Sequence, residues 1–236
     1  MTLPAIGTAP ALDQITTRWS QICDPLRFVM RYSQAIRAYL AAIFRNEDAA
    51  EEACQEFLAK FLERGLDSAV PDRGRFRDYL KISVRNTALA ILRRKHETPV
   101  DPSQLEALAT DTADDAWTLE WQRVVLDKAW RLLEVHERSA PQGLHFTVLK
   151  LAVDFPQETS DQLALRASEQ AKREINAAAF RKQLSRARQH FAQLIVDEVS
   201  QTLASDVRRD LGEELAELGL LPYVKGHLAD GAADGN

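Results

Sequence analysis

The sequence has only two cysteines, Cys23 and Cys54, and contains no long uninterrupted apolar run. The two cysteines fit no paired metal-ligand spacing, and we expect both to be buried thiols in a reduced setting. A helix that spans a membrane needs about 18 or more consecutive apolar residues, so no membrane span is expected. The first residues lack the basic and then apolar pattern of a secretory signal. These absences predict a cytoplasmic protein without a membrane partner.

Residues that interrupt helices are also scarce, with nine glycines and nine prolines in 236 residues. Apolar residues recur at intervals of three and four, and no stretch alternates as a half-buried strand does. Hydrophobic residues make up 45% of the chain, which is enough for a buried core. We therefore predict an all-α fold, and the length allows one large or two small domains.

No group of catalytic residues is recognisable in the chain. There is no glycine-rich phosphate loop, and no cysteine or carboxylate cluster accompanies His136 and His145, which flank an expected turn. We interpret these two histidines as ordinary structural or surface residues. The sequence thus predicts a protein that is not an enzyme and uses neither a metal nor a cofactor.

Positive charge is concentrated in one stretch of a chain whose formal net charge is −5. Residues 73–96 carry eight basic residues against one acid, Asp78. On a helix, Arg77, Lys81 and Arg85 form a stripe beside an apolar face. That face consists of Phe76, Leu80, Val84, Thr87 and Ile91. Most such charge runs are solvated surfaces, but here the usual interspersed acids are missing.

This stretch is therefore predicted to bind nucleic acid. Lysine and arginine bind phosphates, while polar and aromatic side chains contact bases. Asn86 lies off the basic stripe, and its amide suits the edge of a base. The candidates are Arg75, Arg77, Tyr79, Lys81, Arg85, Asn86, Arg93, Arg94 and Lys95.

A second basic segment lies near residues 172–191. Asn176 is a suitable N-cap for a helix whose buried face holds Ala177, Phe180, Leu184, Ala187 and Phe191. Following "SDQLALRAS", this pattern indicates a helix, a turn and a recognition helix, although many basic amphipathic helices are only surfaces. The DNA-binding candidates here are Asn176, Arg181, Lys182, Ser185, Arg186 and Arg188.

An acidic helix precedes the first basic stretch. Its residues Asp48, Glu51, Glu52, Gln55 and Glu56 cluster on a surface that DNA would repel. A protein partner with a basic surface would fit it. Ordinary enrichment of acids at a helix N-terminus explains it equally well.

Taken together, these segments resemble a bacterial RNA polymerase sigma factor of the extracytoplasmic-function class. The residues that carry the resemblance are "NEDAAEEACQEFLAKFLERG", "GRFRDYLKISVRNTALAILRRK" and "FRKQLSRARQHFAQLIVDEV", with "TTRWSQI" and "EELAELGLL" as flanks. The resemblance covers about residues 13–96 and 117–221. It departs from the family where "RASEQAKREINAAA" replaces a short turn that often holds glycine or serine.

The resemblance implies two helical domains and a set of partners. The region 2-like bundle, 13–96, would dock on the clamp helices of the largest polymerase subunit through Asp48, Glu51, Glu52, Gln55, Glu56 and Phe57. Its basic helix would hold and open the −10 element of promoter DNA. The region 4-like helix-turn-helix domain, 117–200, would bind the −35 element. An anti-sigma factor is a further partner that the resemblance leaves open.

The rest of the chain is expected to connect and flank these domains. Residues 1–12 read as a flexible N-terminus, 97–116 as an acidic linker, and 201–236 as a further helix with a tail. Two alternatives remain open. One is a helical DNA-binding regulator that works without polymerase, and the other is a sigma-like adapter that has lost promoter recognition.

Overall fold

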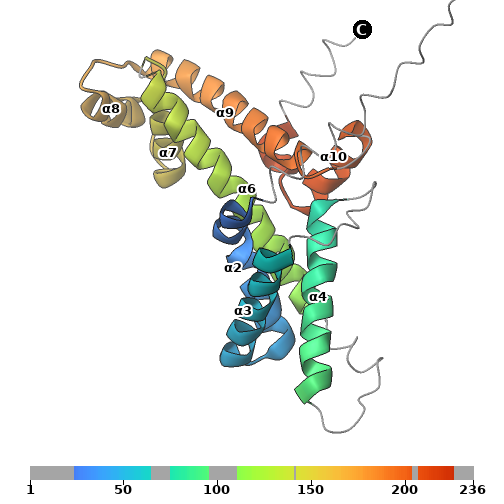
Figure 1. The fold of residues 1–236 in the computed structure, drawn as a ribbon. Helices are drawn as coiled ribbons and strands as arrows, with labels where there is room; N and C mark the ends of the chain where they lie inside the picture. Colours follow the sequence, from blue (N-terminus) through green and yellow to red (C-terminus); the bar gives the residue numbers. More distant parts are fainter. Residues whose placement is uncertain (1–23, 65–74, 96–110, 141, 204–206, 226–236) are drawn as a thin grey trace, which may run out of the picture. The chain divides into compact units, whose positions relative to one another are not determined.

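A computed structural model describes residues 24–64, 75–95, 111–140, 142–203 and 207–225 (Figure 1). These residues form helices and no strand, apart from one isolated bridge between Arg75 and Leu203, so the all-α prediction is confirmed. None of the described helices combines the length and apolar character needed to cross a membrane. The chain divides into two compact units, Met1–Trp121 with Gln201–Val207 and Gln122–Ser200 with Arg208–Asn236.

The first unit contains helices α2 (Pro25–Phe44), α3 (Glu47–Arg64) and α4 (Phe76–Lys95), and the first turns of α6 (Asp111–Ser139). Helix α2 begins where the Asp24 carboxylate accepts a hydrogen bond from the Arg27 amide at 2.9 Å, and it ends at Arg45 in a left-handed conformation. The side chain of Asn46 caps α3 in the same way, accepting from the Ala49 amide at 2.8 Å. Local capping therefore sets both ends of α2 and the start of α3.

The core of the first unit is built from stacked aromatic rings. Tyr32 stacks on Trp121 with ring centroids 4.8 Å apart, and Phe28 stacks on Phe61 at 3.8 Å. Trp117 meets Tyr39 edge to face. Both tryptophans are at most 1% exposed, so their burial is a large part of what stabilises this unit.

The second unit contains the rest of α6, followed by α7 (His145–Asp154), α8 (Ser160–Ala171), α9 (Ala177–Ser200) and nearly all of α10 (Val207–Glu217). Trp130 of α6 packs against Phe146 of α7 and Phe191 of α9. The carboxylate of Glu198 is 2% exposed and forms an ion pair with Lys128. That pairing offsets the cost of burying a charge.

The structure divides the chain at different residues from those expected from composition. Residues 111–116, predicted as the end of a linker, are part of α6. Trp117 and Trp121, predicted to begin the second domain, pack in the first unit. The predicted N-terminus 1–12, the first part of the linker and the tail beyond residue 225 lie outside the described residues. The functional separation of two domains stays a prediction.

Candidate functional site

The apolar face predicted for α4 is buried. Phe76, Leu80 and Val84 are each fully buried, and Ile91 is 3% exposed. Thr87 is half-buried, and its hydroxyl donates to the Ser83 carbonyl at 3.2 Å. The opposite side of α4 is consequently the side that remains available to a ligand.

Arg77 does not lie on an exposed stripe as predicted. Its side chain is 4% exposed, with the Asp78 carboxylate 3.9 Å from the guanidinium. At the helical position next to the apolar face it is covered by the packing of the unit, so it is not positioned to bind a DNA phosphate. The prediction of an exposed Arg77 is wrong, and its place is structural.

Lys81 and Arg85 lie at the margin of the buried face. The Lys81 ammonium is 3.3 Å from the Asp114 carboxylate of α6, and its side chain is 25% exposed. Arg85 is half-buried, and its Nε atom is buried without a hydrogen-bond partner. Burial and then the nearby Asp114 carboxylate raise the pKa of Tyr39 to about 12. The positive charge of Arg85 partly opposes that rise. The predicted basic stripe is therefore partly engaged inside the unit.

The exposed side of α4 carries a different set of candidates. Asn86, Arg93 and Arg94 are exposed, and Ile82 is an exposed apolar side chain one turn before Asn86. Tyr79 and Arg75 are half-buried, and the side chain of Lys95 lies outside the described residues. A polar amide, an aliphatic side chain and two guanidinium groups thus share the accessible part of this helix.

Arg94 links this face to the acidic helix α3. Its guanidinium binds both carboxylate oxygens of Glu56, at 2.6 and 2.8 Å. Lys60 donates to the same carboxylate at 2.7 Å. Hydrogen bonds from Lys60 and Arg94 hold the pKa of Glu56 below its ordinary value. A candidate for polymerase binding and a candidate for DNA binding are therefore each other's partners.

The remaining acidic candidates on α3 differ in accessibility. Asp48, Glu52 and Gln55 are exposed. Glu51 is half-buried and forms an ion pair with Arg37 at 3.0 Å. The acidic surface predicted from the sequence is present, with Asp48, Glu52 and Gln55 as its most accessible part.

Phe57 does not belong to that surface. It is 7% exposed and contributes to the core of the first unit. It follows Glu56 in the chain, but one step along a helix turns the side chain by about 100° and here turns it inward. Because Phe57 is buried, the prediction that it docks on polymerase is wrong.

In the second unit, α8 and α9 are joined by residues 172–176. Lys172 adopts the left-handed conformation, with φ of 51°, that glycine usually supplies at a helix end. The Ser168 hydroxyl accepts from the Ile175 amide at 2.9 Å and donates to the Ala164 carbonyl at 2.7 Å. Of the 14 residues predicted as a long turn, 166–171 belong to α8 and 177–179 to α9, so the connection itself is the five residues 172–176.

Helix α9 presents its predicted basic candidates to solvent. Asn176 caps the helix as expected, accepting from the Ala179 amide at 2.8 Å. Phe180 and Ala187 are fully buried and Phe191 is 6% exposed, so the predicted buried face is confirmed at these positions. All six candidates are exposed, namely Asn176, Arg181, Lys182, Ser185, Arg186 and Arg188.

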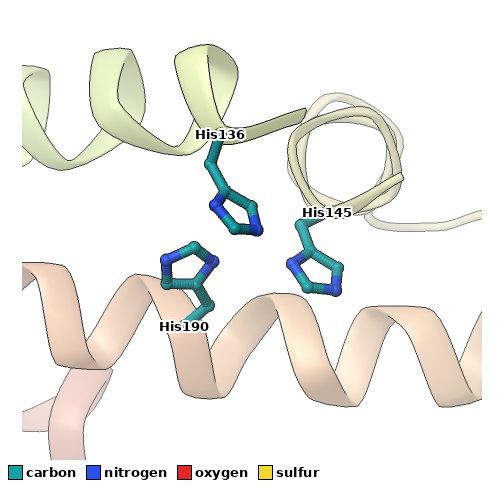
Figure 2. Close-up of side chains that lie close together, drawn as sticks. All are labelled: His136, His145 and His190. Carbon is teal, nitrogen blue, oxygen red and sulfur yellow. The ribbon is translucent and has the colours of Figure 1, made fainter. Parts of the chain in front are cut away.

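Three histidines of the second unit come together, whereas the sequence predicted only ordinary structural or surface roles for His136 and His145. His136, His145 and His190 lie on α6, α7 and α9, and Figure 2 shows their rings turned toward one another. Burial and then His136 lower the pKa of His145, and burial followed by His136 and His145 lowers that of His190. Because 45 residues separate His145 from His190, no local motif signals the cluster.

Comparison with known protein families gives a match on the first unit. Residues 28–98 match the family model of sigma-70 region 2. The matched segment contains most of α2 and all of α3 and α4, including both the acidic helix and the basic helix. The match covers 71 of the 236 residues of the chain. No curated protein and no solved structure gives a significant match.

Proposed function

We propose that this protein is a sigma factor, of the extracytoplasmic-function class that its sequence resembles, which directs RNA polymerase core to promoters and aids their opening. The observation that carries the proposal is the match of residues 28–98 to sigma-70 region 2. That segment pairs an acidic helix with a basic one, and polymerase docking and promoter opening require two surfaces of opposite charge.

The −10 element is assigned to the exposed side of α4. Asn86 is suited to a base edge because its amide both donates and accepts. Ile82 is 56% exposed and offers an apolar surface to an unstacked base, while Arg93 attracts the strand backbone and Arg94, paired with Glu56, adds to the positive charge beside it. Tyr79, Lys81 and Arg85 would contribute from the margin, and Arg77 would support the helix from inside.

Polymerase docking is assigned to the exposed acids of α3. Asp48 and Glu52 carry the charge, and Gln55 adds hydrogen-bonding capacity beside them. Glu51 and Glu56 are engaged in internal ion pairs, so we assign them a supporting role. Charge complementarity of this kind governs the association rate and the choice of partner.

The −35 element is assigned to α9. Its exposed arginine and lysine side chains, beginning one turn into the helix, have the composition of a recognition helix that enters the major groove. The short connection after α8 fits such a helix-turn-helix. The acidic linker before α6 and an anti-sigma partner belong to the same proposal.

Run-off transcription with core polymerase on genomic promoter fragments tests this function. The wild-type protein should give specific transcripts that require both core and the protein. A variant with Arg93→Ala and Arg94→Ala should give far fewer, whereas Arg138→Ala, an exposed cation on α6 with a 74% exposed side chain, should transcribe as the wild type does.

Two other outcomes separate the alternatives. A regulator that acts without polymerase would bind duplex DNA specifically in the absence of core and give no core-dependent transcript. A sigma-like adapter would bind core and fail to start transcription on any fragment. Either result would refute the proposed function.

A further inference from the structure

Outside the surfaces assigned above, the described chain holds one cluster of potential metal ligands. His136 is in the last turns of α6, His145 is the first residue of α7, and His190 is in the middle of α9 (Figure 2). One ring nitrogen from each histidine lies within 4.8 Å of the other two. Three separate helices thus bring imidazoles to a common point.

The spacing of these nitrogens is close to that of a metal site. Three atoms 4.8 Å apart would leave a central ion about 2.8 Å from each, whereas zinc–nitrogen bonds are about 2.0–2.1 Å. Each nitrogen would therefore move inward by roughly 0.7 Å. Rotation about the terminal torsion of histidine is soft enough to supply this without moving the helices.

The donor set of the cluster suits a cation that prefers nitrogen ligands, although the guanidinium of Arg186 acts on His145 and opposes positive charge there. The nearby carboxylate of Glu137 is engaged with α7, accepting from the Thr147 amide at 2.9 Å and from its hydroxyl at 2.5 Å. The cluster itself contains no carboxylate, so the oxygen ligands that calcium and magnesium prefer are missing from it. Imidazole ligands suit zinc and its neighbours among the transition metals.

Access and orientation are also suitable. His136 is exposed, so an ion can enter from solvent, while His145 and His190 are half-buried. The Nδ1 atom of His145 is buried and has no hydrogen-bond partner. Three imidazoles leave a fourth tetrahedral position, which water can occupy on the exposed side.

We propose that His136, His145 and His190 form a binding site for a Zn²⁺ ion in the second unit. The ion would tie the end of α6, the start of α7 and the middle of α9 together. Because the unfolded chain does not hold these residues in place, binding would stabilise the folded unit. This proposal does not depend on the proposed function in transcription.

The test is titration of the full-length, metal-free protein with Zn²⁺ by calorimetry, followed by Co²⁺ absorption as a reporter of tetrahedral coordination. We expect one ion per chain with a dissociation constant of about 1 µM or tighter. Zn²⁺ at about 100 times this constant should raise the melting temperature of the protein by roughly 5 °C or more.

Matched variants identify the ligands. His136→Gln, His145→Gln and His190→Gln should each weaken binding by at least about 10-fold and remove the Co²⁺ spectrum. A control with Cys23→Ser, His96→Gln and His227→Gln keeps all three proposed ligands and should bind as the wild type does. Because His136 is exposed, its replacement leaves the core intact, and circular dichroism checks that the variant folds.

Three results would overturn the proposal. The first is failure of the wild-type protein to bind one equivalent of Zn²⁺. The second is undiminished binding by any one of the three single variants. The third is loss of binding in the control, which would assign the metal to other residues.

Discussion

The contrast between Arg77 and Arg93 on α4 gives a sharp test of how this helix meets DNA. Arg77 is 3% exposed and Arg93 is exposed, although both were candidates for phosphate binding. We predict that Arg93→Ala weakens promoter binding without affecting folding. Arg77→Ala should instead destabilise the first unit and leave the electrostatics of DNA binding nearly unchanged.

The magnitudes follow from the two environments. Each phosphate contact contributes about 0.9 to the slope of log affinity against log salt concentration. A rise from about 50 to 200 mM salt therefore costs about 3.5-fold in affinity per contact, and Arg93→Ala should remove one such factor. For Arg77→Ala, loss of the buried side chain and its polar contacts should reduce the free energy of unfolding by on the order of 2–3 kcal/mol.

The assays are holoenzyme binding to promoter fragments across a salt series, and urea unfolding of each purified variant. The Arg138→Ala variant serves as a matched control, since its side chain is exposed on a different helix. A folded Arg77→Ala protein with wild-type urea stability and a salt slope reduced by about one would refute the assignment of Arg77 to the core.

Three further predictions concern other parts of the chain. Ser168→Ala removes the hydroxyl that holds the connection between α8 and α9, so urea unfolding should show a loss of about 1–2 kcal/mol, and an unchanged midpoint would contradict this. Asp48→Lys with Glu52→Lys should weaken binding to core polymerase at least about 10-fold, and equal affinity of the folded variant would place the docking surface elsewhere. The pKa values of His145 and His190 are lower in the folded protein than in the unfolded chain. As the pH falls below about 6.5, these histidines therefore bind protons more readily in the unfolded chain than in the folded one. Metal-free protein should thus lose stability between about pH 7 and 5, and a variant with both histidines changed to Gln should lose less.

Periodicity in the sequence predicts four of the five positions expected on the buried face of α4 and three of the five expected on that of α9; Thr87, Ala177 and Leu184 are half-buried instead. The four-residue spacing of Phe76, Leu80 and Val84 marks one face of a helix, and these three residues are buried. Asn176 was likewise predicted from local chemistry as an N-cap, and it is one. These features depend on near neighbours in the chain.

Features that depend on distant segments were not predictable in this way. Arg77 lies next to the apolar face of α4. Whether a residue at such a position is exposed depends on which other segments of the unit pack over it. A residue distant in sequence contacts the start of α4, because the Phe76 amide donates a hydrogen bond to the Thr202 carbonyl at 2.9 Å. Trp117 and Trp121 follow an acidic stretch that composition marks as a linker, yet they pack on α2.

The connection before α9 was also not predictable from the sequence. A left-handed residue at a helix end is usually glycine, and Lys172 takes that conformation instead. Without glycine as a signal, the end of α8 could not be located from the sequence. The Ser168 hydroxyl joins the two sides of the connection, donating to the Ala164 carbonyl and accepting from the Ile175 amide.

The measurement that tests the central claim most directly is run-off transcription by core polymerase with and without this protein, on a pool of genomic promoter fragments. The proposed function predicts discrete transcripts that appear only when both are present, and that become far fewer with the Arg93→Ala and Arg94→Ala variant but not with Arg138→Ala. A folded protein that binds core polymerase and yields no transcript from any fragment would contradict it.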